Sequence, residues 1–166
     1  MARVVLTLGD DVSTDTIYPG RFMATVLPTE TPQFAFADLE FNQRLKDKQI
    51  EPGSVIVAGN NFGCGSSREQ AASCLKGHDV AIVAKGFARI FLQNSANLGL
   101  RTIICPAIEA SEGDDLDITP AGIVNMTTGK TFAVVPLPKA RQDIIDAGGL
   151  IAYTRKRLLE HLGRPA

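Results

Sequence analysis

The stretch that decides the fold is the glycine-rich segment Gly59-Asn60-Asn61-Phe62-Gly63-Cys64-Gly65-Ser66-Ser67-Arg68-Glu69. It follows the apolar run 55–58, which predicts a buried strand, and precedes 70–76, which predicts a helix closed by Gly77 at the C′ position. Glycines in such a strand-to-helix loop let the backbone turn sharply or approach a ligand closely. The stretch therefore predicts a loop that places Ser66 and Ser67 at the N-terminus of a helix.

Two interpretations of this loop fit the residue types. Ser66 and Glu69 have the spacing of a capping box, which needs no chemistry at all. Alternatively, the free N–H groups of the helix and the guanidinium of Arg68 bind an anion, because both favour negative charge. A cap leaves Arg68 unexplained, since the dipole disfavours a cation in the first turn. The loop lacks the Gly-Lys-Ser/Thr of a P-loop and the glycine spacing of a dinucleotide site.

Length and composition limit the class of protein. At 166 residues the chain is expected to form one domain, 1–166, with its own core. A net charge of −1 gives no electrostatic reason to expect nucleic acid or a membrane as a partner. No apolar run approaches the length of a membrane span, and the first residues lack the pattern of a signal peptide. We expect the protein to work in the cytoplasm.

The potential metal ligands are few and scattered. Cys64, Cys74 and Cys105 form no Cys-x-x-Cys pair, and His78 and His161 have no partner at ligand spacing. An iron–sulfur cluster needs several cysteine thiolates in a recognisable pattern. The sequence therefore predicts no metal in this chain.

The remaining pattern predicts an α/β domain. Apolar runs at 3–8, 55–58, 80–84 and 102–105 alternate with helical stretches at 70–76 and 87–98. Shorter strands are expected at 116–119, 123–126 and 131–135, with a turn at 127–130, and helices at 140–147 and 150–162. Thr31 and Pro32 predict the start of another helix, whose apolar face would carry Phe34, Ala37, Phe41 and Leu45. We expect a mixed, partly barrel-like sheet flanked by helices.

Three motifs carry a resemblance to a known family. The 59–69 stretch is similar to the signature loop of the swivelling domain of the aconitase superfamily. Gly9-Asp10-Asp11-Val12-Ser13-Thr14-Asp15-Thr16-Ile17 and Ala84-Lys85-Gly86-Phe87-Ala88-Arg89-Ile90-Phe91 resemble two further motifs of that domain. The resemblance runs from about Val4 to about Arg157 and implies the swivelling β/β/α fold, as a free-standing small subunit.

The resemblance also implies roles for individual residues. Ser66 matches the family's serine base, which acts as its alkoxide, and Ser67 and Arg68 match residues that bind substrate carboxylates. Asp15 matches an aspartate that would hold an active-site cation, Arg68; an Asx-turn is the alternative for Asp15. The chain departs from the family at Asn60, where an acidic residue is common, and at Gln70, where histidine is usual.

The implied reaction needs a second chain. A small subunit of this kind belongs to a hydro-lyase that isomerises 2- and 3-isopropylmalate by dehydration and rehydration through 2-isopropylmaleate, in leucine biosynthesis. The hydroxyl is removed with a [4Fe–4S] cluster held by a large aconitase-like subunit. The alternatives are a small subunit for homoaconitate, citramalate or 2,3-dimethylmalate, or a cluster-free anion-binding protein on the same fold.

A short segment is expected to choose the substrate. By resemblance Phe22, Met23, Ala24 and Thr25 face the variable group of the substrate, and homoaconitase-type subunits carry arginine where Ala24 stands. Because an unpaired carboxylate is costly to bury and an isopropyl group is not, we predict preference for isopropylmalate over homocitrate or citrate. Arg21 either swings toward this group or stays a solvated loop cation; long charged side chains usually reach for water.

Overall fold

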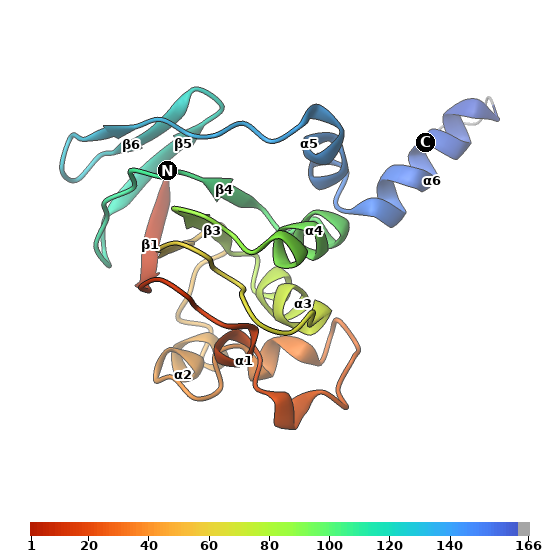
Figure 1. Ribbon diagram of the computed structural model, residues 1–166, viewed down its shortest axis with the longest axis horizontal. Coiled ribbons are helices and arrows are strands. Elements are labelled where there is room, and N and C mark those ends of the chain that lie inside the picture. The colour runs from red at the N-terminus through yellow and green to blue at the C-terminus, as the bar shows by residue number, and fades with distance from the viewer. Residues whose placement is uncertain (163–166) are drawn as a thin grey trace.

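The computed structural model describes residues 1–162 as a mixed sheet covered by helices on one face (Figure 1). The predicted domain spans 1–166, of which 163–166 lie outside the described residues. The strands are β1 (Ala2–Thr7), β2 (Val55–Ala58), β3 (Ala81–Ala84), β4 (Thr102–Ile104), β5 (Asp115–Thr119), β6 (Gly122–Asn125) and β7 (Thr131–Phe132). Their order in the sheet is β4-β3-β2-β1-β5-β6-β7.

The sheet has a parallel half and an antiparallel half. Strands β1 to β4 pair in parallel, whereas β1–β5, β5–β6 and β6–β7 are antiparallel. Both faces of the parallel half are buried, which explains why β2 and β3 read as continuous apolar runs, Val-Ile-Val-Ala and Ala-Ile-Val-Ala. The mixed sheet flanked by helices is the α/β fold that the sequence predicts.

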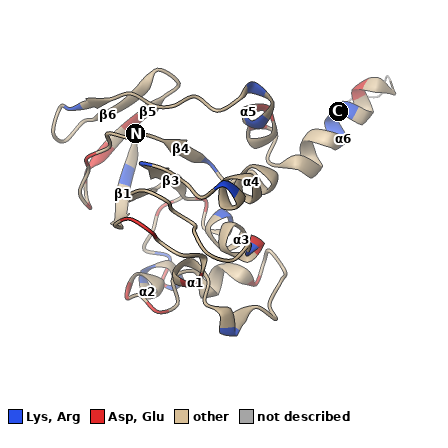
Figure 2. Ribbon diagram, viewed as in Figure 1, with Lys and Arg blue, Asp and Glu red and all other residues tan. Residues whose placement is uncertain are grey.

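Four helices in residues 1–162 are longer than the others. They are α3 (Glu69–Gly77), α4 (Arg89–Leu98), α5 (Lys139–Asp146) and α6 (Leu150–His161), and the shorter ones are α1 (Thr14–Ile17) and α2 (Phe41–Lys46). Helices α3 and α4 lie beside the parallel half of the sheet. Helix α4 ends at Gly99, whose φ of 72° gives a left-handed cap. Helix α6 has no buried residue and extends away from the sheet in Figure 1. In Figure 2 the charged residues of both signs lie mostly on helices and loops, and β2, β3, β4, β6 and β7 carry none.

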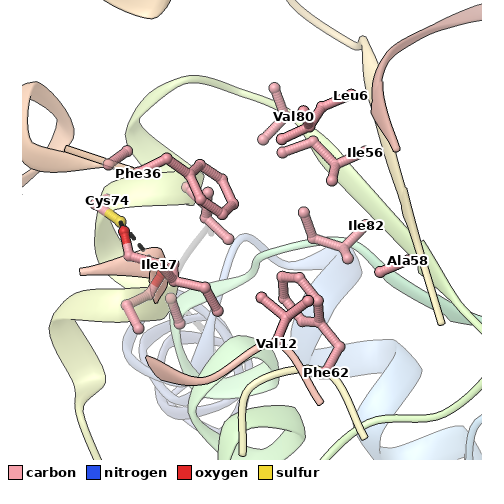
Figure 3. Close-up of a cluster of buried hydrophobic side chains, with 14 of the residues drawn as sticks. Leu6, Val12, Ile17, Phe36, Ile56, Ala58, Phe62, Cys74, Val80 and Ile82 are labelled. Atoms are coloured by element: carbon pink, nitrogen blue, oxygen red, sulfur yellow. Dashed lines mark hydrogen bonds between the residues drawn. The ribbon is translucent and has the colours of Figure 1, made fainter. Parts of the chain in front are cut away.

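Two apolar clusters occupy the two faces of the sheet. The larger one joins Ile56 and Ile82 to helices on one side, and Figure 3 shows Ile17, Phe36, Phe62 and Cys74 in it. The smaller one joins Val55, Val57 and Val83 to Leu116 and Ile123 on the other side. Alternate residues of one strand therefore enter different clusters, as the pleat requires.

The predicted helix beginning at Thr31 is wrong. The structure has a short 3₁₀ turn, Thr31–Phe34, and only then α2, because Phe36 adopts a φ of 52° between them. Its N–H donates to the Ile17 carbonyl (2.8 Å), and the buried amide of Asn42 donates to the Ala35 carbonyl (2.7 Å). Phe41 and Leu45 are buried and Phe34 is half-buried against the same cluster, but tertiary contacts break the predicted helix.

Gly77 has a different role from the one predicted. It is the last residue of α3 rather than a left-handed C′ residue, and His78 is the C-cap. A Cβ on Gly77 would overlap the Pro32 ring. Glycine is required there because the helix passes very close to the segment before α2.

Candidate active site

Three loops meet where parallel strands end. The loops that follow β1, β2 and β3 leave the sheet at the same edge, since the carboxyl ends of parallel strands share an edge. The N–H of Gly59 donates to the Gly9 carbonyl (3.0 Å), and the N–H of Phe62 donates to the Gly86 carbonyl (3.0 Å). The fold thus brings the three motifs of the sequence into one place.

Side chains reinforce the junction of the first two loops. Asp10 accepts the backbone N–H of Asn60 (2.6 Å) and its side-chain amide (3.3 Å), and Asp11 accepts the amide of Asn61 (2.8 Å). An acidic residue at position 60 would face the carboxylate of Asp10. The departure from the family at Asn60 therefore has a structural explanation, which is a donor for Asp10.

Close packing explains Gly63. Its φ is 79°, and a Cβ there would overlap the ring of Phe91. Its N–H donates to the Val12 carbonyl (2.7 Å). Glycine lets the loop lie directly on α4 while it stays bonded to the segment after β1.

Helix α3 begins at Glu69, one residue before the predicted range 70–76. Arg68 is the N-cap of α3 with no side-chain cap, so the capping box of Ser66 and Glu69, one of the two interpretations of this loop, does not form. The Ser66 carbonyl instead accepts the N–H of Arg68 (2.8 Å) and the hydroxyl of Thr14 (3.0 Å). Ser66 and Ser67 are exposed and lie just before the helix. Bonds from a distant residue therefore override the local pattern.

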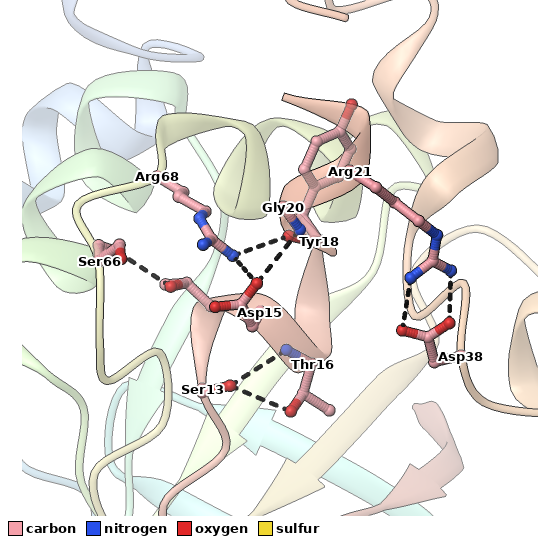
Figure 4. Close-up of polar contacts among 10 residues, drawn as sticks. Ser13, Asp15, Thr16, Tyr18, Gly20, Arg21, Asp38, Ser66 and Arg68 are labelled. Atoms are coloured by element: carbon pink, nitrogen blue, oxygen red, sulfur yellow. Dashed lines mark hydrogen bonds and ion pairs between the residues drawn. The ribbon is translucent and has the colours of Figure 1, made fainter. Parts of the chain in front are cut away.

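Arg68 is fixed by residues around α1 (Figure 4). Its guanidinium forms an ion pair with Asp15 and donates to the Tyr18 carbonyl (3.3 Å). Its side chain is 13% exposed, whereas that of Asp15 is 62% exposed. Asp15 also accepts the N–H of Gly20 (3.1 Å). The arginine is thus held in one orientation by the contact that the predicted role of Asp15 requires.

The same contact shifts the titration of Asp15. The hydrogen bond from Arg68 is the main cause that lowers the pKa of the Asp15 carboxyl below its ordinary value, and the Gly20 N–H adds to it. Asp15 is therefore a charged partner of Arg68 at neutral pH.

The predicted substrate-choosing segment follows these residues. The Phe22 ring stacks on Phe34 at a centroid distance of 4.1 Å, so one of its faces is already covered. Met23 is 38% exposed and Ala24 is exposed. Thr25 is half-buried, and its carbonyl accepts the Tyr18 hydroxyl (3.2 Å). The structure leaves Met23 and Ala24 as the side chains of this segment that are open to a ligand.

Arg21 directly precedes this segment, and its side chain is held by neighbouring residues. It forms an ion pair with Asp38, and its guanidinium lies 4.6 Å from the centroid of the Phe22 ring. Figure 4 shows the Arg21 side chain directed away from Arg68. Sequence reasoning missed Asp38, because no motif marks it.

The sequence reasoning also missed Thr14 and Tyr18 as contacts of the loop. Thr14 is 2% exposed and Tyr18 is fully buried. Both lie in or next to the motif 9–17, so the motif is the signal that points to them.

The described residues do not fit a metal cluster. Cys74 and Cys105 are buried, Cys64 is half-buried, and 1–162 contain no group of three or more potential ligands close together. Burial raises the pKa of the Cys74 thiol, which disfavours the thiolate that binds metals. The same part of the chain has no helix long and apolar enough to cross a membrane.

The comparisons with known proteins agree with this architecture. The family described as the aconitase C-terminal domain matches residues 12–107. The 3-isopropylmalate dehydratase small subunit of Methanosarcina acetivorans is 41% identical over 156 residues, which cover 92% of this chain and 94% of that protein. The isopropylmalate/citramalate isomerase small subunit of Methanocaldococcus jannaschii is 40% identical over 163 residues, covering 94% of each.

A solved structure shares the whole fold. A crystal structure of 3-isopropylmalate dehydratase from Methanocaldococcus jannaschii superposes with a TM-score of 0.86 at 39% identity, covering 98% of this chain and 96% of that one. The chain belongs to the aconitase C-terminal domain family. Within that family it groups with the small subunits of 3-isopropylmalate dehydratase, a hydro-lyase.

Proposed function

We propose that this chain supplies the proton-transferring and carboxylate-binding half of a two-chain hydro-lyase that interconverts 2- and 3-isopropylmalate. The observation that carries the proposal is the arrangement of the 59–69 loop. It presents exposed Ser66 and Ser67 beside Arg68, which is itself fixed by Asp15. The similarity to small subunits of 3-isopropylmalate dehydratase supports this substrate class.

The chemistry assigned to Ser66 is removal of a proton next to a carboxylate. A serine hydroxyl is a weak base at neutral pH and works only where donors and a cation stabilise its alkoxide. Within residues 1–162, the backbone N–H groups of Ser67, Glu69 and Gln70 have no acceptor. These donors at the start of α3, together with Arg68, suit negative charge on Ser66 or on the substrate.

Arg68 and Ser67 are assigned to the carboxylates of the substrate. A guanidinium held from one side by Asp15 keeps further N–H donors for a carboxylate, and the fixed orientation lowers the entropic cost of binding. Asp15 acts on the substrate through Arg68.

The hydroxyl of the substrate leaves with the help of the partner subunit. A [4Fe–4S] cluster of the large aconitase-like subunit would supply the Lewis acid, since the described cysteines here do not fit such a cluster. The site is then shared between two chains that meet as a dehydratase. We place this enzyme in the cytoplasm, in leucine biosynthesis, and propose that the chain works as one swivelling domain without nucleic acid or membrane partners.

The substrate is assigned from the segment after α1. Exposed Ala24 and Met23 offer no cation to a third carboxylate, whereas an isopropyl group gains about 0.8 kcal/mol per carbon on burial. We therefore assign isopropylmalate rather than homocitrate or citrate.

The test is to purify the chain with and without a cluster-bearing large subunit and to follow turnover of 2-isopropylmalate. Turnover is expected only from the assembled pair, and the isolated chain is expected to contain no stoichiometric iron. If no cluster-loaded large subunit ever yields turnover, the enzyme assignment is wrong and the anion-binding alternative takes its place.

A further inference from the structure

Thr14 forms two hydrogen bonds with the backbone of the 59–69 loop. This residue of α1 is 2% exposed. Its N–H donates to the Cys64 carbonyl (2.8 Å), and its hydroxyl donates to the Ser66 carbonyl (3.0 Å). One buried residue therefore binds two carbonyls of the loop, on either side of Gly65.

Fixing these carbonyls also fixes the N–H groups that follow them. In a trans peptide the carbonyl and the next N–H point in opposite directions. With the carbonyls of Cys64 and Ser66 turned toward Thr14, the N–H groups of Gly65 and Ser67 are turned away from it. Neither N–H has an acceptor within residues 1–162.

Gly65 allows this orientation. Its φ is 89°, a left-handed conformation, and a Cβ there would lie 3.6 Å from the Thr14 hydroxyl. The site has room for a side chain, so the backbone conformation is what favours glycine at this position.

Helix α1, which carries Thr14, is itself fixed by a cap and by burial. Ser13 caps it by accepting the N–H of Thr16 (3.1 Å), and Ile17 is fully buried. Asp15, the next residue after Thr14, holds Arg68. One short helix therefore orients both the backbone donors of the loop and its cation.

We propose that Thr14 is a positioning residue, which turns the N–H groups of Gly65 and Ser67 outward as paired donors for a carboxylate of the substrate. This inference rests on the proposed function and extends it to a residue that does not touch the substrate. The competing explanation is that the Thr14 hydroxyl donates to the Ser66 carbonyl only because a buried hydroxyl needs a hydrogen-bond partner, as most buried polar groups do.

Enzyme kinetics separate these explanations. Thr14→Val keeps the shape of the side chain and removes the hydroxyl, and Thr14→Ser restores the hydroxyl. Thr31→Val is the matched control, because Thr31 is also buried and its hydroxyl forms a hydrogen bond with Ser73 of α3 (3.0 Å). The assay uses the assembled two-chain enzyme and 2-isopropylmalate.

In Thr14→Val we expect KM to rise about tenfold with a smaller change in kcat, since the carboxylate is bound in both ground and transition states. Thr14→Ser should recover most of this loss, and Thr31→Val should lower Tm without changing KM. Equal KM values for Thr14→Val and Thr31→Val, or failure of the serine variant to recover, would overturn the inference.

A second measurement does not depend on turnover. In the ¹⁵N-labelled full chain titrated with 2-isopropylmalate, the amide resonances of Gly65 and Ser67 should shift in the native sequence. In Thr14→Val the Ser67 amide should respond weakly, because the hydroxyl bond to the Ser66 carbonyl is lost, whereas the Gly65 amide keeps its response, because the Thr14 N–H still binds the Cys64 carbonyl. If these amides respond but the assembled enzyme never turns over, the proposed function fails and the role of Thr14 stands. If neither amide responds in the native chain, or if the Ser67 amide responds equally in both chains, the role of Thr14 fails.

Discussion

Two arginine–aspartate pairs in neighbouring regions show how burial changes the use of the same chemistry. Arg68 pairs with Asp15 at the loop before α3, and Arg21 pairs with Asp38 in the segment after α1. Each arginine is the main cause of a lowered pKa in its aspartate. The aspartate side chains are similarly open, at 62% and 57% exposed, but the arginine side chains are 13% and 53% exposed.

The difference lies in what else holds the arginine. Arg68 also donates to the Tyr18 carbonyl, which belongs to a fully buried residue. Arg21 lies over the ring of half-buried Phe22. An exposed pair gains little because solvent screens it and both side chains lose freedom, whereas a fixed arginine can bind a planar ligand without further ordering. The comparison supports the proposal that Arg68 binds the substrate, whereas Arg21 stays at the surface.

The largest effect is expected from Ser66→Ala. This variant keeps Arg68 and its ion pair but lacks the proposed base, so it tests whether Arg68 alone supports turnover. Removal of the proposed base should abolish nearly all turnover, because the remaining residues bind the substrate but do not take the proton. Since Ser66 does not cap α3, assembly and Tm should stay close to those of the native enzyme. Near-normal turnover in a fully assembled Ser66→Ala enzyme would contradict the base assignment.

The same arginine-to-lysine substitution in both pairs tests whether burial makes Arg68, but not Arg21, important for activity. Arg68→Lys should lower kcat/KM about 100-fold, because lysine cannot contact Asp15 and a carboxylate through one planar group. Arg21→Lys is the matched control and should leave kcat/KM unchanged. Similar losses in the two variants would show that burial does not separate the pairs.

Asp15→Asn tests the support of Arg68, and we expect a loss of about tenfold in kcat/KM. Because the folded pKa of Asp15 is lowered, the charge-dependent contribution is present above the ordinary pKa and is lost as pH falls through the folded value. The ratio of native to Asp15→Asn activity should therefore be constant between about pH 5 and pH 8. A ratio that falls toward the acid end of this range would show that the pKa of Asp15 is raised rather than lowered.

Local patterns predicted the strands that support the site. The runs 55–58 and 80–84 were readable as buried strands because they are apolar, whereas their parallel pairing and the meeting of their loops at one edge came from the structure. The meeting of Asp15 with Arg68 followed only from the resemblance. Nothing in the spacing of residues so far apart fixes such a contact.

The errors came from contacts between distant residues. The capping pattern of Ser66 and Glu69 is sound locally, but the bond from Thr14, 52 residues earlier, takes the Ser66 carbonyl instead. The helical spacing of the aromatic residues after Thr31 arises from packing around Phe36, whose left-handed backbone no periodicity reveals. Tertiary hydrogen bonds decided both cases.

A smaller effect is expected from Ala24→Arg, which places a cation in the segment that Arg21 does not serve. The new guanidinium should favour a third carboxylate and disfavour an isopropyl group, and one changed contact is worth about 1–3 kcal/mol in discrimination. The measurement is the ratio of kcat/KM for isopropylmalate and homoaconitate in the assembled enzyme. An unchanged ratio would mean that Ala24 does not face the variable group of the substrate.

The smallest effect is expected from Asp38→Asn, which releases Arg21 from its carboxylate. If the Asp38 pair were all that kept Arg21 out of the site, the freed guanidinium would swing toward Ala24 and favour the tricarboxylate. We expect no such shift, because Arg21 lies 4.6 Å from the Phe22 ring centroid and its side chain, 53% exposed, already reaches water. The kcat/KM ratio for isopropylmalate and homoaconitate should therefore equal that of the native enzyme. A shift toward homoaconitate that Arg21→Gln reverses would instead make Arg21 a latent specificity residue and erase the distinction between the two pairs.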